Sequence, residues 1–293
     1  MKYTGDTPSK KIARLAVWKR VKEILGARFF TGSHLVLLSS EAGDISTLLG
    51  LGVHASHIIG VDSDKHAVDA AKFRFDDVRC IKGDVADVAR QLKSSGTKFV
   101  SAYLDFCGPM RENTIGKTIE VTKSLDKKAA VAITVKMGRE QGKWADAVNA
   151  AKSTITTGSG TFYLRTDLLT TELLERGRRL GNWVMPQDFY RCSSLKATEE
   201  KSEMLICVGQ LQPATEGNLK ALANKIGRDA FYSTVAADER AIGPLASLLA
   251  SREEDAHLLL NLRRESVNAY LAHRTRGTYE GRYTGVNRHR RKV

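Results

Sequence analysis

Short apolar runs alternate with stretches of helical periodicity along the first 135 residues of the chain. Short runs rich in Val and Ile are typical of buried strands, whereas apolar residues with a helical repeat are typical of amphipathic helices. The pattern predicts strands at 34–38, 58–61, 78–81, 99–104 and 130–135, and helices at 9–25, 45–50, 65–75, 85–93 and 114–125. Because strands that alternate with helices favour a parallel sheet with helical crossovers, we expect an α/β fold.

The rhythm changes after residue 135. A small helix is expected at 144–151 and a longer one at 167–180. Two strands follow at 188–192 and 204–209, with only the polar segment 193–202 between them. Since neighbouring strands without an intervening helix are typical of a hairpin, we expect the mostly parallel sheet to end in an antiparallel pair.

The C-terminal part of the chain has a different character. Residues 213–273 begin at Pro213 and are rich in Leu, which predicts a small helical appendage packed on the main domain. Residues 274–293 have no apolar periodicity and predict a flexible basic arm. The expected division is therefore a basic N-terminal helix packed on the core at 1–30, a main domain at 31–212, the appendage at 213–273 and the arm at 274–293.

Composition excludes several classes of protein. A chain of 293 residues with 42% hydrophobic residues can bury a sizeable core, and it is not a low-complexity or disordered chain. Its apolar runs are too short to cross a bilayer, and residues 1–11 contain no secretory signal, so we expect a cytoplasmic protein. The four cysteines and seven histidines do not have the spacing of metal ligands, and we expect no metal and no disulfide.

The net charge of +13 is concentrated at the two ends of the chain. Residues 1–30 hold eight Lys and Arg against two acids, and residues 263–293 hold nine against two, so the segment between them is neutral. Such asymmetry favours a polyanionic partner, above all nucleic acid, DNA or RNA. The alternative is that basic ends serve only solubility.

Three acids follow three successive predicted strands. Asp62, Asp84 and Asp105 each come directly after an apolar run or within a few residues of it. In an open parallel sheet the carboxyl ends of the strands share one edge, where ligands bind, so the three carboxylates should converge. An acid after the second strand suits a ribose diol, because a carboxylate accepts both hydroxyl hydrogens. Capping of the following helices is the alternative role, which Ser63 or Asp64 would fill better than Asp62.

The third acid opens the segment Asp105-Phe106-Cys107-Gly108-Pro109. With this segment the chain resembles the S-adenosylmethionine-dependent methyltransferases, in particular those that methylate amino groups. In that family an acid or amide at the end of the fourth strand is followed by prolines and an aromatic residue. The proline pair is absent here. The resemblance covers about residues 10–210 and implies a Rossmann-like methyltransferase fold, with the mostly parallel sheet ending in an antiparallel hairpin.

The resemblance implies S-adenosylmethionine as cofactor. It places the methionine part above the loop 39–44, which has one glycine here, with Glu41 near the cofactor's ammonium group. It places Asp62 at the ribose and Asp84 near the adenine amino group, although Asp84 could equally cap the helix that starts at Val85. The implied cofactor residues are Ser39, Glu41, Gly43, Asp62, Ser63, Asp84 and Val85.

The implied chemistry is methyl transfer to an exocyclic amine of a base. Asp105 would accept the amine hydrogens, and Phe106 would stack on a base held out of its helix. Cys107 leaves open a covalent mechanism, as in enzymes that methylate carbon 5 of pyrimidines. Two other classes also compete: a catalytically inactive nucleic-acid-binding protein on a methyltransferase scaffold, and a nicotinamide-dependent oxidoreductase, which would explain neither the hairpin nor the basic ends.

The basic arm supplies the candidate nucleic-acid contacts. Arginine binds phosphate, tyrosine stacks on bases, and the interleaved glycines let the segment follow an irregular strand. The candidate residues are Arg274, Arg276, Tyr279, Arg282, Tyr283, Arg288, Arg290, Arg291 and Lys292.

Overall fold

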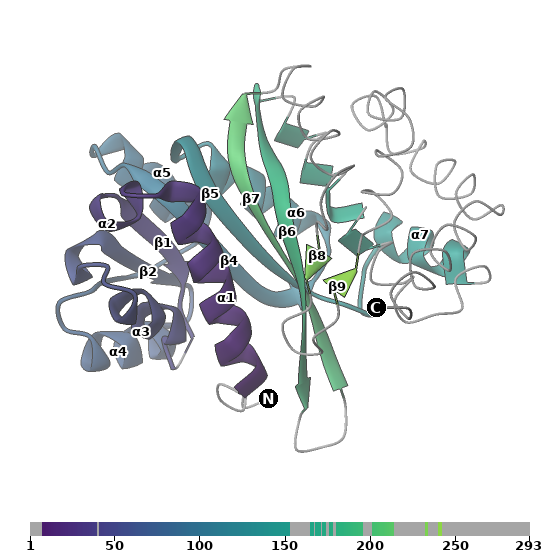
Figure 1. Ribbon diagram of the computed structural model, residues 1–293, viewed down its shortest axis with the longest axis horizontal. Coiled ribbons are helices and arrows are strands. Elements are labelled where there is room, and N and C mark those ends of the chain that lie inside the picture. Colours follow the sequence, from purple (N-terminus) through teal and green to yellow (C-terminus); the bar gives the residue numbers. More distant parts are fainter. Residues whose placement is uncertain are drawn as a thin grey trace, which may run out of the picture.

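Nine strands form one continuous sheet in the part of the chain that the structure describes (Figure 1). The structure is a computed structural model, and it describes residues 8–39, 41–152, 165–166, 168–170, 172–173, 176–177, 180–195, 201–213, 232–233 and 240–241. The strand order is β3-β2-β1-β4-β5-β7-β6-β8-β9. The strands are β1 Ser33–Leu37, β2 Ile58–Asp62, β3 Arg79–Lys82, β4 Phe99–Pro109, β5 Leu125–Lys136, β6 Asn182–Leu195, β7 Lys201–Pro213, β8 Tyr232–Ser233 and β9 Arg240–Ala241.

The first five strands are parallel, and β7 of the β6–β7 hairpin is inserted next to β5 in the opposite sense. β7 pairs antiparallel with β5 and with β6. The strand order reverses between β1 and β4, which is the switch point at which ligands bind in open α/β sheets. A parallel sheet that reverses at its centre and is followed by an antiparallel hairpin is the Rossmann-like methyltransferase fold, to which the two-residue strands β8 and β9 are added here beyond β6. The fold class predicted from the sequence is therefore confirmed.

Helices cover both faces of the sheet. One face carries α1 Pro8–Leu25, α3 Gly43–Gly50 and α4 Lys65–Arg74, and its core includes Trp18, Val36 and Ile58. The other face carries α5 Val85–Ser94, α6 Glu112–Thr122 and α7 Lys143–Lys152. Two shorter elements, α2 Arg28–Thr31 and the 3₁₀ helix Ala55–His57, connect α1 to β1 and α3 to β2.

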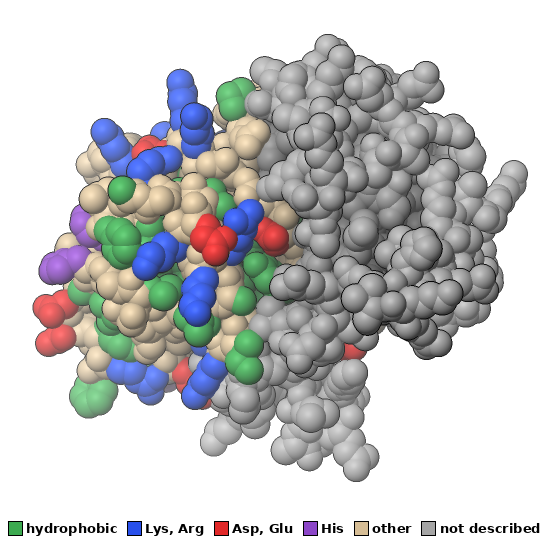
Figure 2. All heavy atoms as spheres, in the orientation of Figure 1, with side chains coloured by type: hydrophobic (Ala, Val, Ile, Leu, Met, Phe, Trp, Pro, Cys, Tyr) green, Lys and Arg blue, Asp and Glu red, His purple; other side chains and the backbone are tan. Residues whose placement is uncertain are grey.

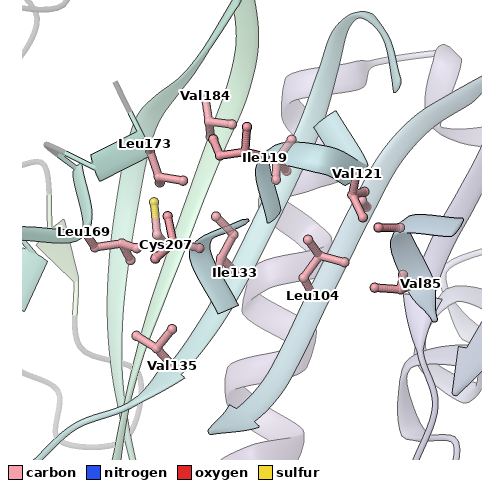
Figure 3. Close-up of a cluster of buried hydrophobic side chains, with 14 of the residues drawn as sticks. Val85, Leu104, Ile119, Val121, Ile133, Val135, Leu169, Leu173, Val184 and Cys207 are labelled. Carbon is pink, nitrogen blue, oxygen red and sulfur yellow. The ribbon is translucent and has the colours of Figure 1, made fainter. Parts of the chain in front are cut away.

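The second face has a continuous apolar core. Figure 3 shows Leu104 and Ile133 of the parallel strands and Cys207 of β7 pointing toward helical side chains that include Val85 and Ile119. All of these side chains are buried. Alternate residues of each strand thus point to this face and pack against its helix layer. The other residues point to the face covered by α1, α3 and α4, so the runs predicted as strands are apolar on both faces.

The structure corrects the predicted faces of α1. The helical repeat of the sequence predicts Ile12 and Leu15 on the apolar face of this helix and Arg14 on its polar, solvated face. In the structure Arg14 is only 8% exposed, whereas Ile12 and Leu15 are 54% and 40% exposed. The buried stripe runs instead through Ala13, Val17, Trp18, Val21 and Leu25. The reason is that Arg14 has a buried acidic partner on α3, so its charge is neutralised inside the fold.

Several strands are also longer than predicted. β4 runs to Pro109 instead of ending at Leu104, and the polar segment 193–202 is partly strand, because β6 continues to Leu195 and β7 begins at Lys201. α6 ends at Thr122, and Leu125 begins β5 instead of ending the helix. Polar and glycine residues hide these extensions in the sequence, and backbone pairing with neighbouring strands decides them.

The C-terminal predictions fall mostly outside the described residues. In the segment 213–273 predicted as a helical appendage, the structure describes only Pro213, which ends β7, and the strands β8 and β9, which pair with each other. The rest of 213–273 and the arm 274–293 lie outside the described residues. Within the described part, no helix is long and apolar enough to span a membrane, and no group of His, Cys, Asp and Glu has the arrangement of a metal site.

Candidate functional site

Asp62 and Asp105 lie level with each other at the carboxyl edge of the sheet. Leu37 of β1 pairs with Val61 of β2, and Val36 pairs with Tyr103 of β4, so Leu38 is flanked by the two acids. Because neighbouring strands are about 4.8 Å apart, the two main-chain positions are about 10 Å apart. Strand alternation places both carboxylates on the face that carries α1, on which Leu38 and Tyr103 pack.

Asp62 is held by the turn that follows β2. Its Oδ1 accepts a hydrogen bond of 2.8 Å from the Asp64 amide. Partial burial raises the pKa of the Asp62 carboxyl, against the lowering effect of that hydrogen bond. Capping of α4 is done by Asp64, whose Oδ1 accepts from the His66 amide at 2.9 Å. The cap is thus Asp64, one of the two residues that the sequence favoured for this role, and the partly exposed Asp62 does not cap the helix.

Asp84 is bound by the first turn of α5 and by α6. Its Oδ1 accepts from the Ala86 amide at 2.9 Å and caps α5, and its Oδ2 forms an ion pair of 2.5 Å with Lys117 of α6. Although partial burial opposes it, hydrogen bonding to Lys117 and the Ala86 amide lowers the pKa of Asp84. The capping role considered from the sequence is therefore confirmed. The neighbouring Val85 is buried in the core beneath α5.

The loop after β1 adopts a left-handed turn without a glycine at that point. Ala42 has φ 45° and ψ 41°, its amide donates to the Ser39 carbonyl at 3.0 Å, and α3 begins at Gly43. Arg74 of α4 donates to the Glu41 carbonyl at 2.6 Å. Ser39 is exposed, and Glu41 is partly exposed. Alanine thus stands in this turn in a backbone conformation that favours glycine.

Asp105 lines a small pocket between α1 and the sheet. The lining residues are Lys10, Ala13 and Arg14 of α1, Tyr103 and Asp105 of β4, Thr134 of β5, and Met204 and Ile206 of β7. Thr134 Oγ1 donates to the Tyr103 hydroxyl oxygen at 3.1 Å. Burial, together with the charges of Asp105 and Asp44, raises the pKa of Tyr103 well above its ordinary value. The hydroxyl therefore stays protonated near neutral pH.

The side chains of Asp105 and Phe106 lie on opposite faces of the sheet. They are consecutive in β4, and Phe106 packs against the core on the face opposite to the pocket of Asp105. The side chain of Cys107 lies outside the described part of the chain. Conversely, Tyr103 and Thr134 were not predicted as neighbours of Asp105. The signal was the strand period, since Tyr103 lies two residues before Asp105 and points to the same face.

Known proteins resemble this chain in architecture only. No protein-family model and no curated protein sequence matches it. Solved structures with some likeness include an rRNA methylase from Streptococcus thermophilus, with 12% identity over 72% of this chain and 100% of that one, and a TM-score of 0.38. An O-methyltransferase from Bacillus cereus in complex with SAH has 10% identity, coverage of 70% and 82%, and a TM-score of 0.38. The plantazolicin methyltransferase BamL has 11% identity, coverage of 69% and 86%, and a TM-score of 0.40.

Proposed function

We propose that this protein is an S-adenosylmethionine-dependent methyltransferase that acts on nucleic acid, with an exocyclic amine of a base as the acceptor. The observation that carries the proposal is the alignment of Asp62 and Asp105 on either side of Leu38. Both acids lie next to the switch point between β1 and β4, where this sheet architecture binds ligands. We assign the Asp62 carboxylate to the cofactor and the Asp105 carboxylate to the substrate.

The cofactor would lie across the tips of β1, β2 and β3. The loop from Ser39 to Gly43 would hold its methionine part, and Asp62 with Ser63 would bind the ribose hydroxyls. At β3, Asp84 would approach the adenine amino group, with Val85 beside it. The bound cofactor would supply an electrophilic methyl group on a sulfonium. The chain's own task is to hold that group in line with the acceptor nitrogen.

Asp105 would act on the acceptor. Its carboxylate would accept a hydrogen bond from the amine, which turns the nitrogen lone pair toward the methyl group and stabilises the positive charge that develops on nitrogen. Lys10 of α1 lines the same pocket and would favour a phosphate-bearing substrate, whereas the charge of Arg14 is neutralised by Asp44. A stacking role for Phe106 would require its side chain to leave the core, since it packs on the other face.

The nucleic-acid substrate rests on the distribution of charge. The chain carries +13, with the excess at its two ends. Figure 2 shows Lys and Arg side chains spread along the face that carries α1, where Lys11 and Lys19 are exposed. A basic surface on the same face as Asp105 suits a polyanion whose reacting base must reach that edge of the sheet.

A catalytically inactive nucleic-acid-binding protein on the same scaffold is the second candidate. Two observations favour it, both at positions that the proposal assigns to the cofactor. Asp84 is already paired with Lys117, and the loop after β1 has alanine instead of glycine at its left-handed residue.

Calorimetric titration with S-adenosylmethionine separates the two candidates. We expect the wild type to bind, and Asp62→Ala to weaken binding by roughly 1–3 kcal/mol, the cost of losing charge-assisted hydrogen bonds. The matched control is Asp69→Ala, which removes an exposed carboxylate from α4 and should leave affinity unchanged. Absence of both binding heat and thermal shift at millimolar cofactor would overturn the enzyme and support the inactive scaffold.

A further inference from the structure

Two side chains of α1 converge on one carboxylate oxygen of α3. Trp18 Nε1 donates a hydrogen bond of 2.8 Å to Asp44 Oδ1, and Arg14 Nε lies 3.3 Å from the same oxygen. Arg14 and Trp18 are four residues apart, so they occupy neighbouring positions on one face of the helix. Asp44 is the second residue of α3 and follows the loop after β1 directly.

This cluster is buried. Arg14 and Asp44 are each 8% exposed, and Trp18 is fully buried. A buried carboxylate is unfavourable unless it is paired and hydrogen-bonded, so Asp44 strongly favours the position in which both α1 donors reach it. The indole itself is fixed by edge-to-face contacts with His34 and Tyr103, at centroid distances of 5.8 Å to each ring. The anchor for Asp44 is therefore rigid.

The loop next to Asp44 needs such an anchor. Ala42 holds a left-handed conformation that an alanine adopts only at a cost in free energy, so the loop is not favoured by its own sequence. The hydrogen bond from Arg74 to the Glu41 carbonyl lies at the surface, where it contributes little. The buried attachment of Asp44 to α1 is the stronger restraint.

The same turn of α1 also borders the pocket of Asp105. Lys10, Ala13 and Arg14 line that pocket together with Tyr103. We propose that Arg14, Trp18 and Asp44 form a clamp by which α1 holds residues 41–44, the turn into α3, in the conformation that binds the cofactor. The inference rests on the proposed function. These three are positioning residues, and cofactor affinity depends on α1 although α1 precedes the sheet domain in the chain.

The test compares Trp18→Phe and Asp44→Asn with the wild-type full-length protein. Trp18→Phe keeps an aromatic ring and removes the indole donor, and Asp44→Asn keeps the volume and removes the charge. The control is Arg20→Gln, which breaks the 2.5 Å ion pair of Arg20 with Asp188 and so loosens α1 from β6 instead of from α3. Two readouts are needed: hydrogen exchange of residues 39–48 in the cofactor-free protein, and titration with S-adenosylmethionine.

We expect both clamp variants to speed exchange of residues 39–48 and to raise the cofactor Kd about tenfold, the usual effect of losing one hydrogen bond to a charged group. Arg20→Gln should change neither. Unchanged exchange in the clamp variants would overturn the clamp and leave the proposed function intact. Faster exchange with unchanged affinity would overturn the positioning role. A wild type that binds no cofactor would overturn the proposed function and the cofactor part of this inference together, and exchange would still decide whether α1 holds the loop.

Discussion

The imidazole of His34 and the hydroxyl of Ser101 form a hydrogen bond of 2.7 Å between β1 and β4 in the buried centre of the sheet. The other ring nitrogen, Nε2, lies 2.8 Å from the Phe29 carbonyl oxygen. A carbonyl can only accept, so Nε2 carries the hydrogen, and Nδ1 of the neutral ring accepts from Ser101. Both nitrogens of the neutral ring are thus satisfied in the buried interior.

This arrangement predicts acid sensitivity. Burial, which outweighs the hydrogen bond to Phe29, lowers the pKa of His34 from 6.5 to about 4. Between pH 4 and pH 6.5, His34 carries a proton in the unfolded chain but not in the folded protein. The free energy of unfolding is therefore at its full value above pH 6.5 and decreases as the pH falls toward 4. We expect the free energy of unfolding to drop by about 2 kcal/mol from this residue between pH 7 and pH 5.

Urea unfolding at the two pH values provides the measurement. His34→Gln is the control, because it removes the titrating group whatever its own effect on stability. Between pH 7 and pH 5, the free energy of unfolding of the His34→Gln protein should fall less than that of the wild type, by about 2 kcal/mol. Equal drops in the two proteins would show that His34 does not titrate in this window.

A second prediction concerns the loop after β1. Ala42→Gly relieves a left-handed alanine, worth about 1–2 kcal/mol, and loses a buried methyl group and some chain entropy, which cost a similar amount together. We therefore expect unfolding free energy within about 0.5 kcal/mol of the wild type. Ala71→Gly is the contrast, since Ala71 is buried inside α4 with ordinary φ, and it should lose about 2 kcal/mol. Equal losses in chemical denaturation would contradict the left-handed turn.

The parallel strands could be predicted from the sequence, because strands buried on both faces are apolar throughout. For β1 and β2, the apolar run and the turn residues on either side of it are sufficient to predict the strand. The end of β4 could not be predicted in this way. Its last residues, from Asp105 to Pro109, lack the apolar pattern, and pairing of Pro109 with Lys136 is what extends the strand.

The part of the candidate site that follows directly from the ends of the strands could be predicted from the sequence. Asp62, Asp84 and Asp105 were found because they follow apolar runs, and Asp62 and Asp105 are aligned by the register of β2, β1 and β4. Arg14 was assigned to solvent because residue type alone favours it. Its burial depends on Asp44, thirty positions away, and no local pattern reports such a partner.

The third prediction distinguishes two mechanisms of methyl transfer. If Asp105 acts on the acceptor amine, Asp105→Ala should abolish methyl transfer and leave cofactor affinity nearly unchanged, because Asp105 lies in the pocket beside α1 instead of at β2. Cys107→Ala should keep most of the activity. Single-turnover assays with radiolabelled cofactor, together with titration, check both variants. A folded Cys107→Ala protein without activity would favour a covalent mechanism instead.

The last prediction concerns the arm, which lies outside the described residues. Removing residues 274–293 deletes seven Lys and Arg and one acid, Glu280. If these cations contact phosphates, the slope of log affinity against log salt should become shallower by about 0.7–0.9 for each lost contact. Affinity should therefore fall most at low ionic strength and approach that of the full chain at high salt, where screening removes the difference.

Nucleic-acid binding across a salt series, for the full chain and the truncated one, measures this effect. The fold should survive truncation, because the segment has no apolar periodicity with which to join a core, and thermal melting provides that control. A truncation that melts like the full chain and keeps the same salt slope would mean that the arm does not contact phosphate. The attraction would then have to come from α1, where Lys11 and Lys19 are exposed, and charge reversal there should lower the slope instead.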